Sequence, residues 1–298
     1  MLRPVQEGAQ GCAAIGAALH EPAAGSALKH QRFLLLEDSS IWDHDAQKDR
    51  FPLLAQRCDR LEIRLQLIRR ELTAERSPQR TAILVWADGL DRRAEQLSVT
   101  DCADPLDELD LERFADEPNA RGFGAEIEGP VLLVCTHGRK DPCCAERGRT
   151  MLAALRAAGA DAWHTTHLGG DRFAANVFAV PAGVMLGRAP AATARELLAE
   201  LQQGEAPPEL MRGRVGYAPH VQAAEVAFRR ANDIRSLTAV EPTSVEQSSD
   251  GRWTVGLRHE DAAHSVVVRH VTTGVLRPTS CRNEELKDPG QWEVVEIR

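Results

Sequence analysis

The chain has 298 residues, of which 43% are hydrophobic and 27% charged, the composition of a folded globular protein with one large core or two ordinary ones. Its formal net charge of -8 argues against a nucleic-acid-binding protein, because such proteins normally present a basic face. No apolar run approaches the roughly 20 residues needed to span a bilayer, and Cys12 to Leu19 makes a poor signal peptide because Glu7, not a basic cluster, precedes it. We expect a cytoplasmic protein that binds neither nucleic acid nor membrane.

The first 125 residues predict a small α/β unit. Residues 12–19 have the composition of a small-residue helix, and residues 61–68 alternate apolar and polar side chains as in a half-buried strand. Asp88-Gly89 is a favoured turn pair, so the strands on either side of it should form a hairpin. The expected strands are residues 32–37, 61–68, 81–86 and 94–99, with helices over 51–58 and within the acidic segment 101–116. Residues 117–129 are the best candidate linker.

The second unit, residues 126–235, begins with a buried strand at residues 131–134. A helical pattern follows over residues 145–158, and then come a strand at 162–166 and a loop at 167–171, where paired glycines interrupt regular structure. Two further strands are expected at 176–180 and 184–187, and helices at 192–203 and 222–231. The order strand, helix, strand, loop, strand, turn, strand predicts a thioredoxin-like sheet.

The tail, residues 236–298, is expected to form antiparallel β-structure. Residues 253–258 and 264–271 alternate with period two after an Asp250-Gly251 turn, and a last strand is expected at 292–297. The predicted fold class is therefore α/β, with a thioredoxin-like unit preceded by a smaller α/β unit and followed by an antiparallel β extension.

The seven cysteines do not form a disulfide framework, because an odd number is spread over nearly 300 residues. Only Cys135, Cys143 and Cys144 cluster, and clustered cysteines in a reducing compartment indicate metal or redox chemistry. The other four are interpreted as buried small apolar side chains: Cys12, Cys58, Cys102 and Cys281.

Three side chains with metal-binding chemistry follow the predicted strands and helix of the second unit. Cys135 ends the first strand, and Cys144 follows after eight intervening residues, at the start of the helix, where the helix dipole stabilises a thiolate. His167 begins the glycine loop after the next strand, at the same end of the sheet. Thiolate and imidazole bind transition metals and iron–sulfur clusters, so these residues predict such a site.

Two long motifs resemble the sucrase/ferredoxin-like family, whose members include thioredoxin-like [2Fe-2S] ferredoxins. The first is the run CTHGRKDPCCAERG at residues 135–148, and the second is WHTTHLGGDRFAAN at residues 163–176. Further matches cover nearly the whole chain: Cys12, Phe33 to Glu37, Trp42, Gly187-Arg188, Gly213 to Glu225 and Cys281. The resemblance implies a cluster held by two cysteines and two histidines, at the positions of Cys135, Cys144, His167 and Asp171.

Asp171 departs from that pattern, since aspartate is a rare, harder iron–sulfur ligand than imidazole. Three interpretations remain open. Asp171 could coordinate iron weakly, another residue could supply the fourth ligand, or this chain could keep the fold without the cluster. The alternative donors are Cys143, His164, His137 and Cys281. His137 could equally be a hydrogen-bonding loop residue, His164 an exposed strand residue, and Cys143 a packing residue, because adjacent side chains point apart.

The predicted function is one-electron transfer to a redox partner protein, whose identity the sequence does not give. Imidazole in place of thiolate raises a cluster's potential, so we expect a value above that of an all-cysteine plant-type ferredoxin. The alternatives are a structural zinc site using Cys135, Cys144, His164 and His167, and a thiol oxidoreductase working through Cys143 or Cys144, which lacks the usual Cys-x-x-Cys spacing. Sucrose hydrolysis is disfavoured, because no segment presents a pair of glycosidase carboxylates.

Overall fold

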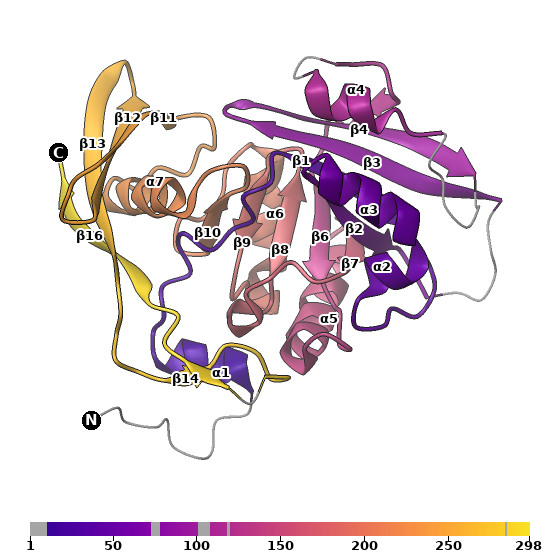
Figure 1. Ribbon diagram of the computed structural model, residues 1–298, viewed down its shortest axis with the longest axis horizontal. Coiled ribbons are helices and arrows are strands. Elements are labelled where there is room, and N and C mark those ends of the chain that lie inside the picture. Colours follow the sequence, from indigo (N-terminus) through magenta and orange to yellow (C-terminus); the bar gives the residue numbers. More distant parts are fainter. Residues whose placement is uncertain (1–10, 73–77, 101–107, 118–119, 284) are drawn as a thin grey trace.

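The computed structural model describes residues 11–72, 78–100, 108–117, 120–283 and 285–298, and shows the mixed α/β fold that the sequence predicts (Figure 1). One large sheet contains ten strands: β1 (Arg32–Glu37), β2 (Ile63–Arg69), β3 (Gln79–Asp88), β4 (Asp91–Thr100), β5 (Ala125–Glu126), β6 (Val131–Cys135), β7 (Asp161–Thr165), β8 (Val177–Val180), β9 (Val184–Leu186) and β10 (Met211–Arg214). The helices are α1 (Cys12–Ala18), α2 (Ala46–Arg50), α3 (Pro52–Arg60), α4 (Leu111–Asp116), α5 (Pro142–Ala157), α6 (Ala194–Gln202) and α7 (Pro219–Ala231). Cys102 and residues 101–107 of the predicted acidic helix lie outside the described residues.

The large sheet consists of two halves with the same topology. Its strand order is β10-β9-β8-β6-β7-β2-β1-β3-β4-β5. On one side of the centre, β7 pairs parallel with β6, and β8 and β9 follow, each antiparallel to the strand before it. On the other side, β2 pairs parallel with β1, and β3 and β4 follow in the same way. The order β7-β6-β8-β9 is the thioredoxin-like arrangement expected of the second unit. We call β1–β4 with α2 and α3 the N-terminal half, and β6–β9 with α5 and α6 the C-terminal half.

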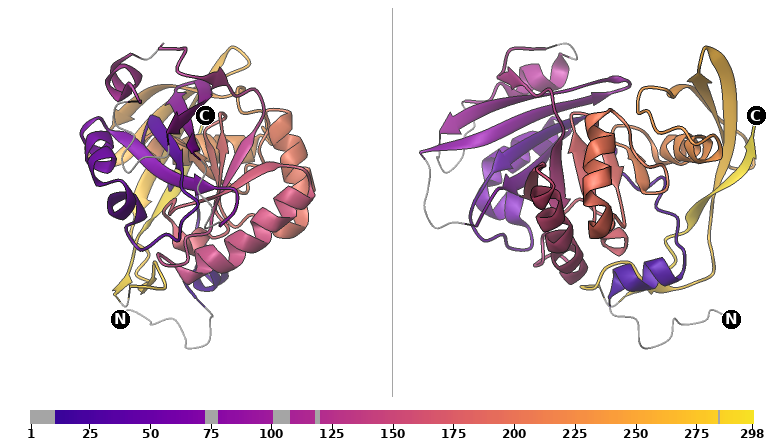
Figure 2. Two further views of the ribbon diagram at one scale, coloured as in Figure 1. Left: turned by 90° about the vertical axis from the view of Figure 1, so that its right-hand side faces the viewer. Right: turned by 180° about the vertical axis from the view of Figure 1, so that it is seen from behind.

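The two halves meet through β2 and β7, which pair antiparallel at Ile68–Thr165 and Arg69–His164. Because corresponding strands pair antiparallel, the halves are related by a local two-fold axis. The sheet is also strongly curled (Figure 2), and this brings β1 and β8 face to face although three strands separate them in the sheet. The rings of Phe33 and Phe178 lie 5.1 Å apart between centroids. The concave face of the sheet therefore encloses a core that both halves share.

Burial on both faces explains the continuous apolar sequence of the central strands. Phe33 and Leu35 of β1 point into the shared core, whereas Leu34 and Leu36 pack outward beneath α3. Likewise, Leu133 of β6 faces the shared core, and the neighbouring side chains of β6 pack against α5 and α6. Each half thus has its own outer core beneath its helices.

The tail forms a second, four-stranded antiparallel sheet, as predicted. Its order is β11 (Glu241–Gln247), β12 (Arg252–His259), β13 (Ala262–Val271) and β16 (Gln291–Ile297). Helix α7 packs against this sheet through Val221, Ala224 and Phe228. Between β13 and β16 the chain runs back to α1 and forms the short pair β14 (Arg277–Pro278) and β15 (Leu286–Lys287), with β14 beside α1 (Figure 1). Within the described residues, none of the helices has the length and apolar character to cross a membrane.

Candidate metal centre

Three donor side chains converge at one end of the C-terminal half. Cys135 is the last residue of β6, Cys144 is the third residue of α5, and His167 is the second residue after β7. The two sulfur atoms and a ring nitrogen of His167 all lie within 4.8 Å of one another. The sequence predicted these three residues from strand and helix ends alone, and the structure places them together in a group that could hold a metal ion.

The start of α5 is fixed so that Cys144 lies over the end of β6. Asp141 caps the helix, with its carboxylate accepting a hydrogen bond of 2.8 Å from the backbone N–H of Cys143, and Pro142 occupies the first helical position. Gly148 lets the helix approach the strand closely, since a Cβ there would lie 2.0 Å from the carbonyl oxygen of Cys135. Any larger residue at position 148 would therefore force α5 away from the end of β6.

Asp171 lies beside this group, at the start of a short 3-10 turn, Asp171–Phe173. Its Oδ1 lies 3.0 Å from Nδ1 of His167 and accepts a hydrogen bond of 3.3 Å from the thiol of Cys144. Nδ1 of His167 has no hydrogen-bond partner among the described residues, because its orientation towards Asp171 is not that of a hydrogen bond. Asp171 thus contacts two members of the group formed by Cys135, Cys144 and His167, and it is the carboxylate that could join them as a fourth ligand.

The pKa values of the four groups reflect this crowding. The pKa of Cys135 lies well below its usual value, because the thiol of Cys144 and the ring of His167 donate hydrogen bonds to its thiolate. The pKa of Cys144 is raised by the same hydrogen bond and by burial. Burial also raises the pKa of Asp171. Burial alone would lower the pKa of His167, but its interactions with Cys135 and Asp171 raise this pKa above its usual value. A bound cation would allow both thiols and the carboxyl group to ionise together.

Arg212 of β10 anchors the loop that carries His167 and Asp171. Its buried guanidinium donates hydrogen bonds to the carbonyl oxygen of Gly169 at 2.9 Å and to Oδ1 of Asn176 at 3.0 Å. Burial lowers the pKa of Arg212 to about 10, so the side chain stays cationic near neutral pH. This residue was not predicted from the sequence, because the four residues of β10, MRGR, have neither an apolar run nor a clear alternation.

The other predicted donors make different contacts. Nε2 of His137 lies 2.7 Å from the carbonyl oxygen of Asp43, and Nδ1 of His164 lies 2.9 Å from Oγ1 of Thr136. Burial lowers the pKa of His164 to about 4, so its ring is neutral near pH 7. Cys143 and Cys281 belong to a separate group of side chains. The interpretation of Cys281 as a buried apolar residue was wrong, since it lies exposed on the loop after β14, whereas Cys12 and Cys58 are buried as expected.

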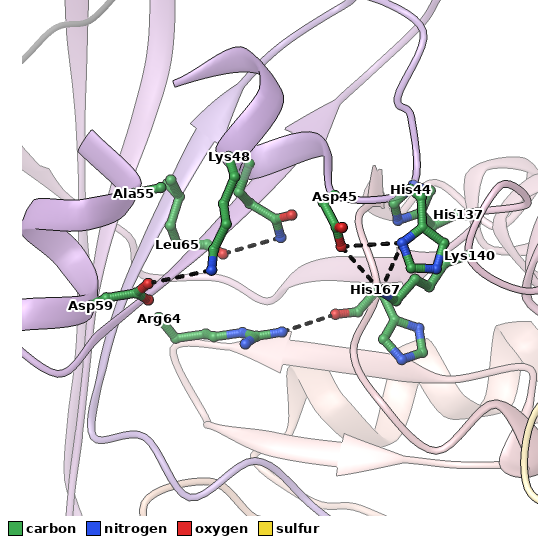
Figure 3. A pocket seen from close by; sticks show the side chains of 11 residues that line it. His44, Asp45, Lys48, Ala55, Asp59, Arg64, Leu65, His137, Lys140 and His167 are labelled. Carbon is green, nitrogen blue, oxygen red and sulfur yellow. Dashed lines mark hydrogen bonds and ion pairs between the residues drawn. The ribbon is translucent and has the colours of Figure 1, made fainter. Parts of the chain in front are cut away.

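His167 is the solvent-facing member of the group. Cys135 and Cys144 are buried, but the side chain of His167 is 22% exposed and lines a pocket of about 260 Å³ (Figure 3). The opposite wall comes from the N-terminal half, through α2 and α3 and the start of β2. The charged side chains lining the pocket are Asp45, Lys48, Asp59, Arg64 and Lys140. Access to the candidate centre is therefore shaped by both halves.

Comparisons with known proteins bear on the central part of the chain. The model of the family described as Sucrase/ferredoxin-like matches residues 23–213, well over half of the chain. No curated protein and no solved structure is significantly similar. The matched region contains Cys135, Cys144, His167 and Asp171, but neither Cys12 nor Cys281. The chain belongs to the sucrase/ferredoxin-like family.

Proposed function

We propose that the protein is a thioredoxin-like [2Fe-2S] ferredoxin that transfers single electrons, with Cys135, Cys144, His167 and Asp171 as cluster ligands. The observation that carries the proposal is the convergence of two buried sulfurs and one imidazole at the end of β6, at the start of α5 and after β7. Membership of the sucrase/ferredoxin-like family adds support. Electron transfer is the chemistry that such a cluster supplies when bound.

The donor set fits a cluster with two different ends. The two cysteines and Asp171 are buried, whereas His167, 3.0 Å from Asp171, lines the pocket. The unpartnered Nδ1 of His167 would gain a bond to iron, and the thiolate of Cys135 is already favoured. Replacing two thiolates by histidine and aspartate removes one negative charge, so the potential should lie between that of plant-type and Rieske centres.

The protein residues would control how an electron enters and leaves. The cysteine side is covered by β6 and α5, whereas His167 faces the pocket between the two halves, so a redox partner protein would approach there. Arg212 would hold the loop of His167 and Asp171 in place, and its charge would offset part of the negative charge of the ligands.

The decisive experiment is spectroscopic. Protein purified without oxygen should be brown, with visible absorption that bleaches on dithionite, and should contain iron and acid-labile sulfide in equal amounts. The reduced protein should show the electron paramagnetic resonance signal of a mixed-valence iron pair. A colourless protein that takes up no iron after reconstitution with iron and sulfide would contradict the proposal.

A single zinc ion at the same residues is the second candidate. The observation in its favour is compactness, since Cys135, Cys144 and His167 offer donor atoms within 4.8 Å of one another, as around one tetrahedral ion. Asp171, rather than His164, would be the fourth ligand, because Asp171 contacts His167 and Cys144 whereas His164 does not belong to the group. Zinc that is lost from C135A protein, in a preparation without iron, would favour this alternative. Metal-free protein with a reactive thiol would favour a thioredoxin-like redox role.

A further inference from the structure

A second group of thiols lies beside the candidate centre but faces away from it. Cys12 is the first residue of α1, Cys143 is the second residue of α5, and Cys281 lies on the loop after β14. The sulfur of Cys281 is 3.2 Å from that of Cys143 and 3.5 Å from that of Cys12. With a carboxylate oxygen of Asp141, these donor atoms all lie within 4.8 Å of one another. Residues up to 269 positions apart in the sequence thus present their sulfurs to one point.

Asp141 holds the three chain segments together. Its side chain is fully buried, and its carboxylate accepts hydrogen bonds from the backbone N–H groups of Cys143 at 2.8 Å and Cys281 at 2.6 Å. The hydroxyl of Ser280 donates a third hydrogen bond at 3.0 Å. The oxygens of Asp141 also lie 3.7 and 3.9 Å from the sulfur of Cys12. The carboxylate is therefore oriented by the backbone and faces the thiols.

The backbone around the sulfurs is also adapted to them. The N–H group of Cys12 donates a hydrogen bond of 3.2 Å to the sulfur of Cys281, an interaction that stabilises a thiolate. Gly11 has a positive φ of 82°, and a Cβ at this position would lie 2.6 Å from the sulfur of Cys143. A glycine is thus required for the chain to pass this close to the sulfurs.

We propose that Cys12, Cys143 and Cys281 bind a single zinc ion as thiolates, with Asp141 as the fourth ligand. Zinc–sulfur bonds of about 2.3 Å in a tetrahedral shell place ligand sulfurs roughly 3.8 Å apart. The sulfur separations of 3.2 and 3.5 Å reach that value with small side-chain movements. Three thiolates and a carboxylate form a closed donor set, which is typical of structural rather than catalytic zinc.

Two other uses of the thiols fit the geometry less well. A disulfide has a sulfur–sulfur bond of about 2.05 Å and joins two residues, so it would leave the third thiol of the group unpaired. A second two-iron cluster would need its two pairs of ligands on two separate irons, whereas all four donors here, and only three at the first group, lie within 4.8 Å of one another. A single ion would bind all four donors after small side-chain movements.

A zinc ion here would tie two segments that are distant in the sequence to the candidate centre. It would join α1 and the loop after β14 to the start of α5, where Cys143 directly precedes Cys144. Cys12 and Cys281 lie outside residues 23–213, the part of the chain that matches the family. The proposal does not depend on which metal the first group binds.

The test is metal analysis of the full-length protein purified with reduced thiols and supplied with zinc. We expect wild-type protein to hold one zinc per chain in this site, and Cys281→Ala to lose it while keeping the iron and visible absorption of the first group. Cys135→Ala should lose the iron but keep this zinc. Cys58→Ala, which removes a buried thiol in α3 far from both groups, is the matched control and should keep both metals.

Cobalt substitution gives a second measurement on the unaltered protein. Cobalt bound by three thiolates absorbs strongly in the visible and near-ultraviolet, and we expect this absorption in wild-type and C135A protein but not in Cys12→Ala. Wild-type protein that binds no zinc or cobalt, or C281A and C12A variants that keep the full amount, would overturn the proposal. So would a Cys143–Cys281 disulfide found by mass spectrometry in protein purified under reducing conditions. Absence of iron alone would count only against the first site.

Discussion

The two halves of the large sheet have the same strand order, but among the described residues only the C-terminal half carries a group of metal donors. In both halves a buried strand leads to a helix with proline at its first position, Pro52 or Pro142, and a parallel strand follows. The three donor positions can therefore be compared directly. At the positions of Cys135, Cys144 and His167, the N-terminal half has Glu37, Leu54 and Glu71.

The corresponding corner of the N-terminal half is held by an ion-pair cluster instead. Asp38, the residue after β1, is buried and accepts a hydrogen bond of 2.6 Å from Ser40. Its carboxylate also pairs with Arg80 at 3.3 Å and Arg50 at 3.4 Å. The same topology thus brings a strand end and neighbouring side chains together in both halves. The residue types then decide whether these side chains can bind a metal ion or form ion pairs with arginines.

The largest expected effect is the contrast between removing a thiol of the candidate centre and removing a buried thiol of the N-terminal half. Cys144→Ala should abolish iron binding and visible absorption, because it removes a cluster ligand, whereas C58A should leave both unchanged. Cys58 is a fair control, since it is also buried and lies in α3, which corresponds to α5. Iron content and absorption per folded chain are the measurements. Equal iron in the two variants would mean that the proposed site does not hold the cluster.

The second prediction concerns the ion-pair corner of the N-terminal half. Asp38→Asn should lower the free energy of unfolding at pH 7 by about 3 kcal/mol, because it removes the buried carboxylate charge that pairs with Arg80 and Arg50. Urea denaturation measures this loss. Iron content per folded chain should stay at the wild-type level, because Asp38 belongs to the other half. Loss of iron in folded D38N protein would show that the two corners are coupled.

The pH dependence of D38N follows from the pKa of Asp38. Burial alone would raise this pKa, but the hydrogen bond from Ser40 and the charges of Arg50 and Arg80 lower it below its usual value. The stabilisation is therefore fully present above the unfolded-state pKa of about 4 and is lost as the pH falls towards the folded-state pKa. The difference between wild-type and D38N protein should be constant at neutral pH and shrink below about pH 4. A difference that shrinks already at pH 6 would point to another group.

The third prediction tests the fourth ligand. Asp171→His replaces a negative ligand with a neutral imidazole, so the cluster potential should rise by on the order of 100 mV. Protein-film voltammetry gives the value. Asp59→Asn is the control, because Asp59 is exposed on the N-terminal wall of the same pocket and its loss should change the potential much less. Equal shifts in the two variants would indicate a general charge effect and not ligation by Asp171.

Much of the fold could be predicted because its central elements have strong local patterns. The apolar runs of β1, β6 and β8 and the Asp88-Gly89 hairpin were all anticipated and are present. β10 and β11 were missed, because MRGR and EPTSVEQ lack a clear apolar pattern. The equivalence of the two halves was not anticipated either, since it lies in strand order and direction and no sequence repeat accompanies it.

The candidate centre could be predicted in part because the strands and the helix that carry its donors have strong local patterns. Cys135, Cys144 and His167 follow regular elements, so their approach was inferred from the topology, whereas their role as cluster ligands stays a prediction. The position of Asp171 came only from the family resemblance. The pairing of Cys12 with Cys281 could not be predicted, because it depends on the return of the chain between β13 and β16, which no local pattern indicates.

The smallest expected effect tests whether the halves share one core. Phe33 of β1 and Phe178 of β8 touch only because the sheet curls, so a double-mutant cycle with leucine at both positions should give a coupling of about 1 kcal/mol. A control cycle of Phe51 and Phe178 should be additive, because Phe51 lies in the outer core beneath α3. Coupling confined to the first pair would show that the curl of the sheet brings the two halves into stabilising contact. Additivity in both cycles would mean that the contact of Phe33 with Phe178 adds nothing measurable to the stability of the shared core.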